Sequence, residues 1–137
     1  MHPLWITQLG LKMDFNFYAF YNAQQYYQHY VELKTPWVLV SQNDHATLQF
    51  YVQLKMYGDS SYNNIRVSLE GSGWHTKTLL TMYKTTTDWT QQSLSITKFG
   101  ELRIVFRFYN YNRYTNSNSY NAAIDDVVIR STNGCNL

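Results

Sequence analysis

Hydrophobic and polar residues alternate one by one along much of this chain, and a period of two is typical of β-strands that bury one face. The clearest example is 102–109, where Leu102, Ile104, Phe106 and Phe108 alternate with Arg103, Arg107 and Tyr109. The same alternation predicts strands over 46–57, 65–70 and 93–96. Further strands are expected over 74–83 and over the more continuously apolar 122–129, and no segment shows a sustained helical period.

Turn-forming residues separate these strands, for example Gly58-Asp59-Ser60-Ser61 and Gly71-Ser72-Gly73. In the N-terminal third the alternation is weaker, because Tyr and Gln clusters blur both faces of the segments around 15–19 and 27–31. With about eight or nine strands, each sheet must bury one face against another. We therefore expect an all-β fold, an antiparallel two-sheet β-sandwich with jelly-roll topology. The length of 137 residues suits a single domain over 1–137.

Composition agrees with this fold and narrows the partners. Aromatic residues make up 18% of the chain and charged residues only 15%, so strand formers dominate. The net charge of +2 comes from scattered Lys and Arg, which argues against a nucleic-acid partner. No stretch approaches the roughly 18 consecutive apolar residues that a membrane span needs.

The composition and the first residues also bear on where the protein is located. The first residues do not form a secretory signal, because they lack a basic leading region, and Lys12 and Asp14 interrupt any apolar run. A polar surface rich in Asn, Thr and Tyr, with one Cys, is nevertheless typical of proteins that face the outside. We expect an extracellular or cell-surface location, or a place in a virion.

A long polar segment provides the candidate binding residues. Between two predicted strands, 110–120 contains Asn, Ser, Tyr and Thr without an apolar period, and long loops tend to bind or assemble. Tyrosines can be ordinary sheet-face residues with solvated hydroxyls, or amphipathic rings of a binding surface. On the second interpretation, the binding residues are Tyr109, Tyr111, Asn112, Arg113, Tyr114 and Tyr120.

A series of short motifs follows in order from Leu33 to Ile129. They are Leu33-Lys34-Thr35-Pro36, Ala46-Thr47-Leu48-Gln49-Phe50, Val67 through Trp74, Trp89 with Ile96, Ile104-Val105-Phe106-Arg107-Phe108, and Ala123-Ile124-Asp125-Asp126-Val127-Val128-Ile129. This order resembles the MAM-like and cleaved-adhesin-type jelly-roll domains of secreted and surface proteins. The resemblance implies a jelly roll, a non-enzymatic interaction role and a structural Ca²⁺ near Asp125 and Asp126.

The two adjacent aspartates also raise a question of their own. Successive side chains of a strand point to opposite faces, so either Asp125 or Asp126 should point toward the core. A buried carboxylate must be paired, hydrogen-bonded or bound to a metal. Two hypotheses remain: the pair helps to hold Ca²⁺, or a carboxylate caps a turn or pairs with Arg103 or Arg107.

Motifs for catalysis are missing. His2, His29, His45 and His75 lack metal-ligand spacing, and no G-x-S-x-G is present. Cys135 near the end is a poor nucleophile candidate, and a single cysteine allows no internal disulfide. Carboxylates for glycoside hydrolysis need only spatial proximity, and no pair stands out in the sequence. We expect a protein that is not an enzyme.

Three functions fit these observations. The first is a non-catalytic extracellular adhesion or assembly module that acts through aromatic-rich surfaces, including self-association into a surface structure or filament. The second is a carbohydrate-binding module, and the third is a virion or phage-tail structural protein. The expected partners are therefore a protein or a glycan.

Overall fold

Antiparallel strands account for most of the residues that the computed structural model describes, which are 4–6, 12–23, 29–42, 45–56, 64–84, 86, 88–110 and 120–131. Within these ranges there are ten strands and no helix. The strands are β1 (Leu4–Ile6), β2 (Lys12–Ala23), β3 (His29–Lys34), β4 (Val38–Val40), β5 (Ala46–Met56), β6 (Asn64–Gly71), β7 (Trp74–Met82), β8 (Thr90–Ile96), β9 (Gly100–Asn110) and β10 (Tyr120–Ser131). No helix in this part of the chain is long and apolar enough to cross a membrane.

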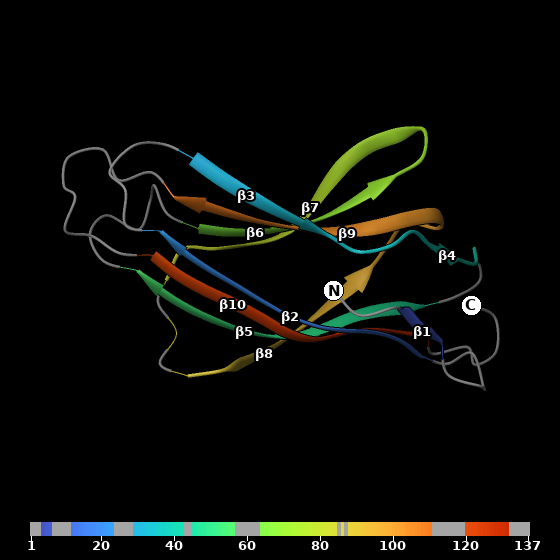
Figure 1. The fold of residues 1–137 in the computed structure, drawn as a ribbon. Coiled ribbons are helices and arrows are strands. Elements are labelled where there is room, and N and C mark those ends of the chain that lie inside the picture. Colours follow the sequence, from blue (N-terminus) through green and yellow to red (C-terminus); the bar gives the residue numbers. More distant parts are fainter. Residues whose placement is uncertain are drawn as a thin grey trace.

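The strands form two sheets that lie face to face (Figure 1). Sheet A has the order β1-β2-β10-β5-β8. Sheet B has the order β3-β9-β6-β7, with β4 paired to β9 beyond the end of β3. The predicted all-β, antiparallel two-sheet sandwich is confirmed. β4 corresponds to a short apolar run expected from Trp37 to Val40, whereas β1 raises the strand count to ten, because a strand of three residues is too short to show alternation.

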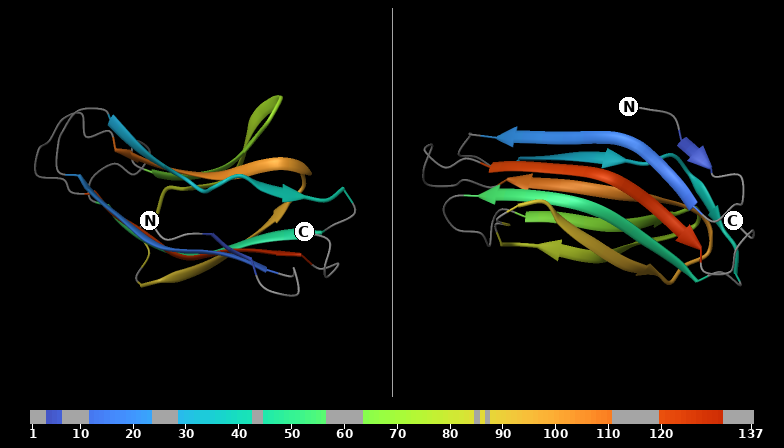
Figure 2. Two further views of the ribbon diagram at one scale, coloured as in Figure 1. Left: turned by 45° about the vertical axis from the view of Figure 1, so that its right-hand side comes forward. Right: turned by 90° about the horizontal axis from the view of Figure 1, so that it is seen from below.

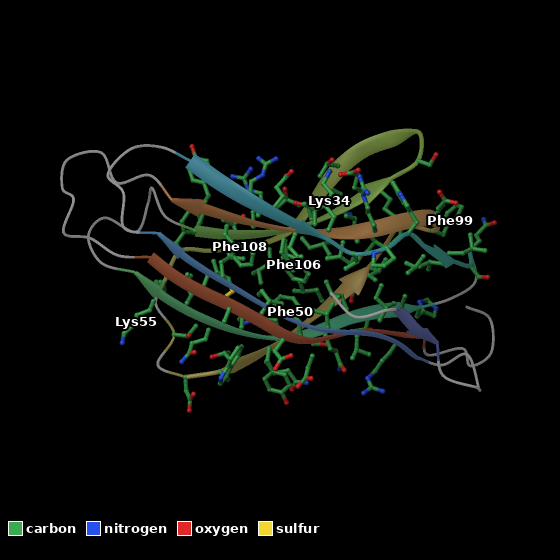
Figure 3. The ribbon with its side chains drawn as sticks, viewed as in Figure 1. Lys34, Phe50, Lys55, Phe99, Phe106 and Phe108 are labelled. Carbon is green, nitrogen blue, oxygen red and sulfur yellow. The ribbon has the colours of Figure 1, made fainter. Side chains whose placement is uncertain are left out.

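The core lies between the sheets and uses the alternate positions that the sequence predicted. Leu48, Phe50, Val52 and Leu54 of β5 and Leu102, Ile104 and Phe106 of β9 are fully buried. The rings of Phe50 and Phe106 meet edge to face across the two sheets, with centroids 5.2 Å apart (Figure 3). Burial of this apolar area from both sheets is the main stabilising term of the sandwich.

The edge of sheet B is interrupted between β3 and β4. At this break, Thr35 makes two hydrogen bonds to Ile104 of β9, one through its backbone and one through its side chain. Its N–H donates to the Ile104 carbonyl at 3.0 Å, and its Oγ1 accepts the Ile104 N–H at 3.0 Å. Val38 then pairs with Leu102. Two residues, Pro36 and Trp37, therefore stand opposite the single residue Arg103 of β9. The extra residue returns Val38 to the core and leaves Trp37 on the outside.

The outer face of sheet B is hollowed. At one end the beginning of β3 curves away from sheet A, and at the other the β6–β7 hairpin rises (Figures 1 and 2). The hairpin turns at Ser72-Gly73, where Gly73 has φ 82°, a conformation that side chains disfavour. This curvature follows the twist of an open sheet, and it makes the outer face of sheet B the concave side.

Candidate functional site

A pocket of about 300 Å³ lies on this concave face. It is lined by Glu32, Arg66, Ser68, Glu70, Thr76, Thr78, Val105 and Arg107, which come from all four main strands of sheet B. This volume is at the lower end of the range for small-ligand pockets, which runs from roughly 300 to 1,000 Å³. The lining is polar except for one valine, so the pocket is suited to a hydrophilic ligand.

One row of charged residues crosses the sheet at one side of the pocket. Strand register places Glu32 opposite Arg107, and Arg107 opposite Arg66. Arg107 donates from Nε and Nη2 to Glu32 Oε2, at 3.0 and 2.7 Å. Arg66 is exposed, and it forms no ion pair or hydrogen bond within the described part of the chain. Its guanidinium therefore remains available to a ligand.

The next row forms the floor of the pocket. Val105 and Ser68 pair directly, and Ser68 pairs with Thr78. Val105 and Ser68 point outward but are each only 5% exposed, because longer side chains surround them. Thr76 and Thr78 on β7 add exposed hydroxyls at one wall. The side chains of the floor are short and several of those around them are long, and this difference in length deepens the face of the sheet into a pocket.

The third row is charged again and includes an aromatic ring. Arg103 donates from Nε and Nη2 to Glu70 Oε1, at 3.1 and 2.5 Å, and Lys34 Nζ lies 3.5 Å from Glu70 Oε2. The Arg103 hydrogen bond is the main cause that lowers the pKa of Glu70 below its ordinary value of 4.5. Arg103 also lies over the Trp37 ring, with Cζ 4.4 Å from the centroid.

The two charged rows are held at a constant separation. Arg103 and Arg107 are four residues apart on β9, which corresponds to about 13 Å along an extended strand. Both arginines are fixed by a carboxylate on a neighbouring strand. The donors and acceptors of the walls are therefore oriented before any ligand arrives, which lowers the entropic cost of binding.

The structure describes only part of the predicted binding loop. Tyr109 lies on the outward side of β9, two residues beyond Arg107, and its side chain is half-buried. Tyr120 begins β10 in sheet A, so the two tyrosines that flank the loop belong to different sheets. Tyr111, Asn112, Arg113 and Tyr114 lie outside the described residues, and their binding role stays a prediction.

The expectation that Asp125 or Asp126 faces the core is wrong. β10 has a bulge at this point, and Asp126 adopts a positive φ of 53°. The extra residue leaves Asp125 half-buried and Asp126 exposed, while Val127 returns to the core. Asp125 Oδ1 accepts the Asp126 N–H at 2.8 Å. This contact is local to the bulge, and Arg103 and Arg107, which were the candidate partners of these carboxylates, pair with glutamates instead.

The calcium prediction rests on the same pair of aspartates. Ca²⁺ takes six to eight oxygen ligands. Within the described residues, no group of three His, Cys, Asp or Glu side chains comes together to hold a metal ion. The structural Ca²⁺ near Asp125 and Asp126 therefore stays a prediction from the sequence.

The pocket is not predicted from the sequence, although the sequence contains one relevant signal. Arg66, Ser68 and Glu70 were expected on the outward side of one strand, and Arg103 and Arg107 on the outward side of another. In a chain with few charges, two strands with charges at a period of two indicate a polar sheet face. The pairing of β6 with β9, which brings these residues together, is not visible in the sequence.

Comparisons with known proteins yielded structural matches only. No family model and no curated protein matches the chain. The similar solved structures include a protein titled carbohydrate binding module family29, at 16% identity and TM-score 0.43, and two point mutants of family 29 carbohydrate binding modules, at 15% identity and TM-score 0.47 and at 16% identity and TM-score 0.48. They cover 64%, 75% and 75% of this chain, and the chain spans 51%, 62% and 58% of theirs.

Proposed function

We propose that this protein is a non-catalytic carbohydrate-binding module, with the sheet B pocket as its binding site. The observation that carries the proposal is the pocket itself: an open, polar hollow with charged walls fixed by ion pairs, one of which, Glu70–Arg103, continues to the Trp37 ring on which Arg103 stacks. The extracellular or cell-surface location predicted from the sequence belongs to the same proposal, because polysaccharides are abundant there.

The chemistry of the walls suits sugar hydroxyls. A hydroxyl donates one hydrogen bond and accepts others, and the ion pairs Arg107–Glu32 and Arg103–Glu70 each place a donor next to an acceptor. Hydrogen bonds to charged groups are the stronger ones. Hydroxyls of Thr76, Thr78 and Ser68 extend the same surface.

Trp37 provides an apolar surface next to these polar groups. Its side chain is 39% exposed, although it sits over Arg103. The Pro36–Trp37 insertion holds it outside the core, between the fixed positions of Thr35 and Val38. An amphipathic ring of this kind buries much area at low entropic cost, which suits the apolar face of a sugar ring.

The carboxylates of the pocket favour binding over hydrolysis. A glycosidase needs one carboxyl group with a raised pKa to act as the acid. The pKa of Glu70 is lowered by Arg103, and Glu32 is bonded to Arg107. Glu70 is therefore better suited to accept hydrogen bonds from a ligand than to protonate a leaving group.

A glycan array and affinity gel electrophoresis with soluble polysaccharides test the proposal. We expect binding to at least one class of glycan, reduced about tenfold or more by Trp37→Ala. Tyr51→Ala is the matched control, because Tyr51 is 38% exposed but lies on β5 of the opposite sheet. No binding to any glycan, or equal losses in the two variants, would contradict the proposed site.

Self-association is a second candidate, and one surface favours it. Leu39 and Phe99 are 63% and 55% exposed at the same end of sheet B, where Val40 pairs with Gly100 (Figure 3). Light scattering after size-exclusion chromatography tests it: oligomers dissociated by Leu39→Lys would support assembly, and a monomer at high concentration would not. The virion hypothesis stays a prediction from the sequence.

A further inference from the structure

Arg66 and Arg107 stand directly opposite each other on neighbouring strands, inside the sheet B pocket. Like charges in this position are destabilising, because directly opposed Cβ atoms on paired strands are roughly 4.5–5.5 Å apart. Glu32 compensates Arg107, but it lies on the far side of Arg107 from Arg66. The pair is an arrangement that an anion between or above the two guanidinium groups would stabilise.

The excess of positive charge around the pocket also favours an anionic ligand. Lys34, Arg66, Arg103 and Arg107 face only two carboxylates, Glu32 and Glu70, in the pocket and its adjoining ion pairs. Both carboxylates are already bonded to an arginine. Of these four cations, only Arg66 has no ion pair or hydrogen bond with another described residue.

From these observations we infer that the ligand is an acidic glycan, whose uronate carboxylate binds Arg66 while its hydroxyls contact the rest of the pocket. This inference rests on the proposed function and specifies its substrate class. A guanidinium matches a carboxylate with two parallel hydrogen bonds, which a neutral sugar cannot provide. Ser68 on the floor and Thr78 at one wall line the same pocket as Arg66, and their hydroxyls can contact the sugar ring that carries the carboxylate.

The same charges disfavour a densely charged polyanion. Glu32 and Glu70 lie in the pocket with Arg66, and they would repel successive phosphates or sulfates. A glycan that carries a carboxylate on only some of its sugar rings places its charges farther apart, and therefore fits one unpaired guanidinium between carboxylates. The net charge of +2 for the whole chain also gives little general attraction to nucleic acid.

Pairs of polymers that differ only in charge test the inference. Polygalacturonate, glucuronoxylan and hyaluronan are each compared with their own carboxyl methyl ester by affinity gel electrophoresis, beside neutral polysaccharides, heparin and single-stranded DNA. We expect at least one acidic form to bind about tenfold more tightly than its ester. Arg66→Gln should remove this preference, because it should weaken binding of the acid far more than binding of the ester, whereas Arg66→Lys should retain part of the preference.

Arg130→Gln is the matched control, because Arg130 is exposed on sheet A and its loss changes net charge equally. Binding to neutral and esterified polymers without preference for the acid would overturn the inference and leave the proposed function standing. No binding to any polysaccharide would overturn both. Preference for heparin or DNA over every uronate, or an equal effect of Arg130→Gln, would also overturn the inference.

Discussion

Trp37 and Arg103 are stacked, with the guanidinium carbon 4.4 Å from the ring centroid, and each is held in position by a different feature of sheet B. Trp37 is outside the core because two residues there stand opposite one on β9. Arg103 is held by Glu70 on the other side. The stacked pair therefore connects the interrupted edge of the sheet to the wall of the pocket.

This contact should be measurable as a coupling energy. In a double-mutant cycle of Trp37→Ala and Arg103→Gln, we expect a coupling of about 0.5–1 kcal/mol in the free energy of unfolding, since the pair is partly exposed. Urea denaturation of the four proteins provides the measurement. Strict additivity of the two losses would mean that the stacking contributes nothing to stability.

The free energy of unfolding should fall more when Thr35 loses its hydroxyl group than when it loses its methyl group. Thr35→Val has nearly the same shape, but it leaves the buried Ile104 N–H without an acceptor, which costs about 1–3 kcal/mol. Thr35→Ser keeps the hydroxyl and should cost less. Thr86 makes the same two bonds to Leu54, but at a less buried edge.

Chemical denaturation of these variants checks the expectation. Thr86→Val serves as the matched control, and we expect a smaller loss than for Thr35→Val, because water can replace the hydroxyl there. If Thr35→Val and Thr35→Ser were equally stable, the hydrogen bond to Ile104 would be unimportant.

Glu70 should contribute stability that disappears in acid. Its pKa in the folded protein is below 4.5 because Arg103 donates hydrogen bonds to the carboxylate, with a further lowering from Lys34. A group whose pKa is lowered by folding stabilises the folded state above its unfolded pKa, and this contribution is lost as the pH falls through the folded value. The stability difference between wild type and Glu70→Gln should be largest above pH 4.5 and vanish in stronger acid. Thermal unfolding across this pH range measures it, and a difference that is independent of pH would argue against the ionic contribution.

Asp126 should respond to substitution through its backbone. At φ 53° a residue with a Cβ is disfavoured, and glycine is not. We expect Asp126→Gly to be more stable than Asp126→Ala by about 1 kcal/mol. Both variants keep the backbone N–H that bonds to Asp125, so the comparison isolates the conformation. Equal unfolding midpoints in urea would show that the bulge carries no strain.

The sandwich could be predicted because its central strands alternate strictly. β5 and β9 place every second side chain in the core, and both were expected as half-buried strands. The pocket could not be predicted in the same way. Its arginines belong to strands far apart in sequence, and only the register of β6 against β9 brings Arg66 to Arg107.

Irregular positions within strands are a second feature of the fold that could not be predicted from the sequence. The insertion at Pro36–Trp37 and the bulge at Asp125–Asp126 each shift the inside-outside pattern by one residue. A strict period of two assigns one of the aspartates to the core, which is incorrect. Nothing in the local sequence distinguishes such a shift from a regular strand, because the register of the neighbouring strands determines it.

The division of β6 and β9 into inward and outward side chains has a consequence for how this protein can diversify. Ile65, Val67 and Leu69 hold the fold from one side of β6, while Arg66 and Glu70 present chemistry on the other. Selection can therefore alter recognition by exchanging every second residue without weakening the framework beneath. A library randomised at outward positions alone should yield mostly folded variants with new preferences.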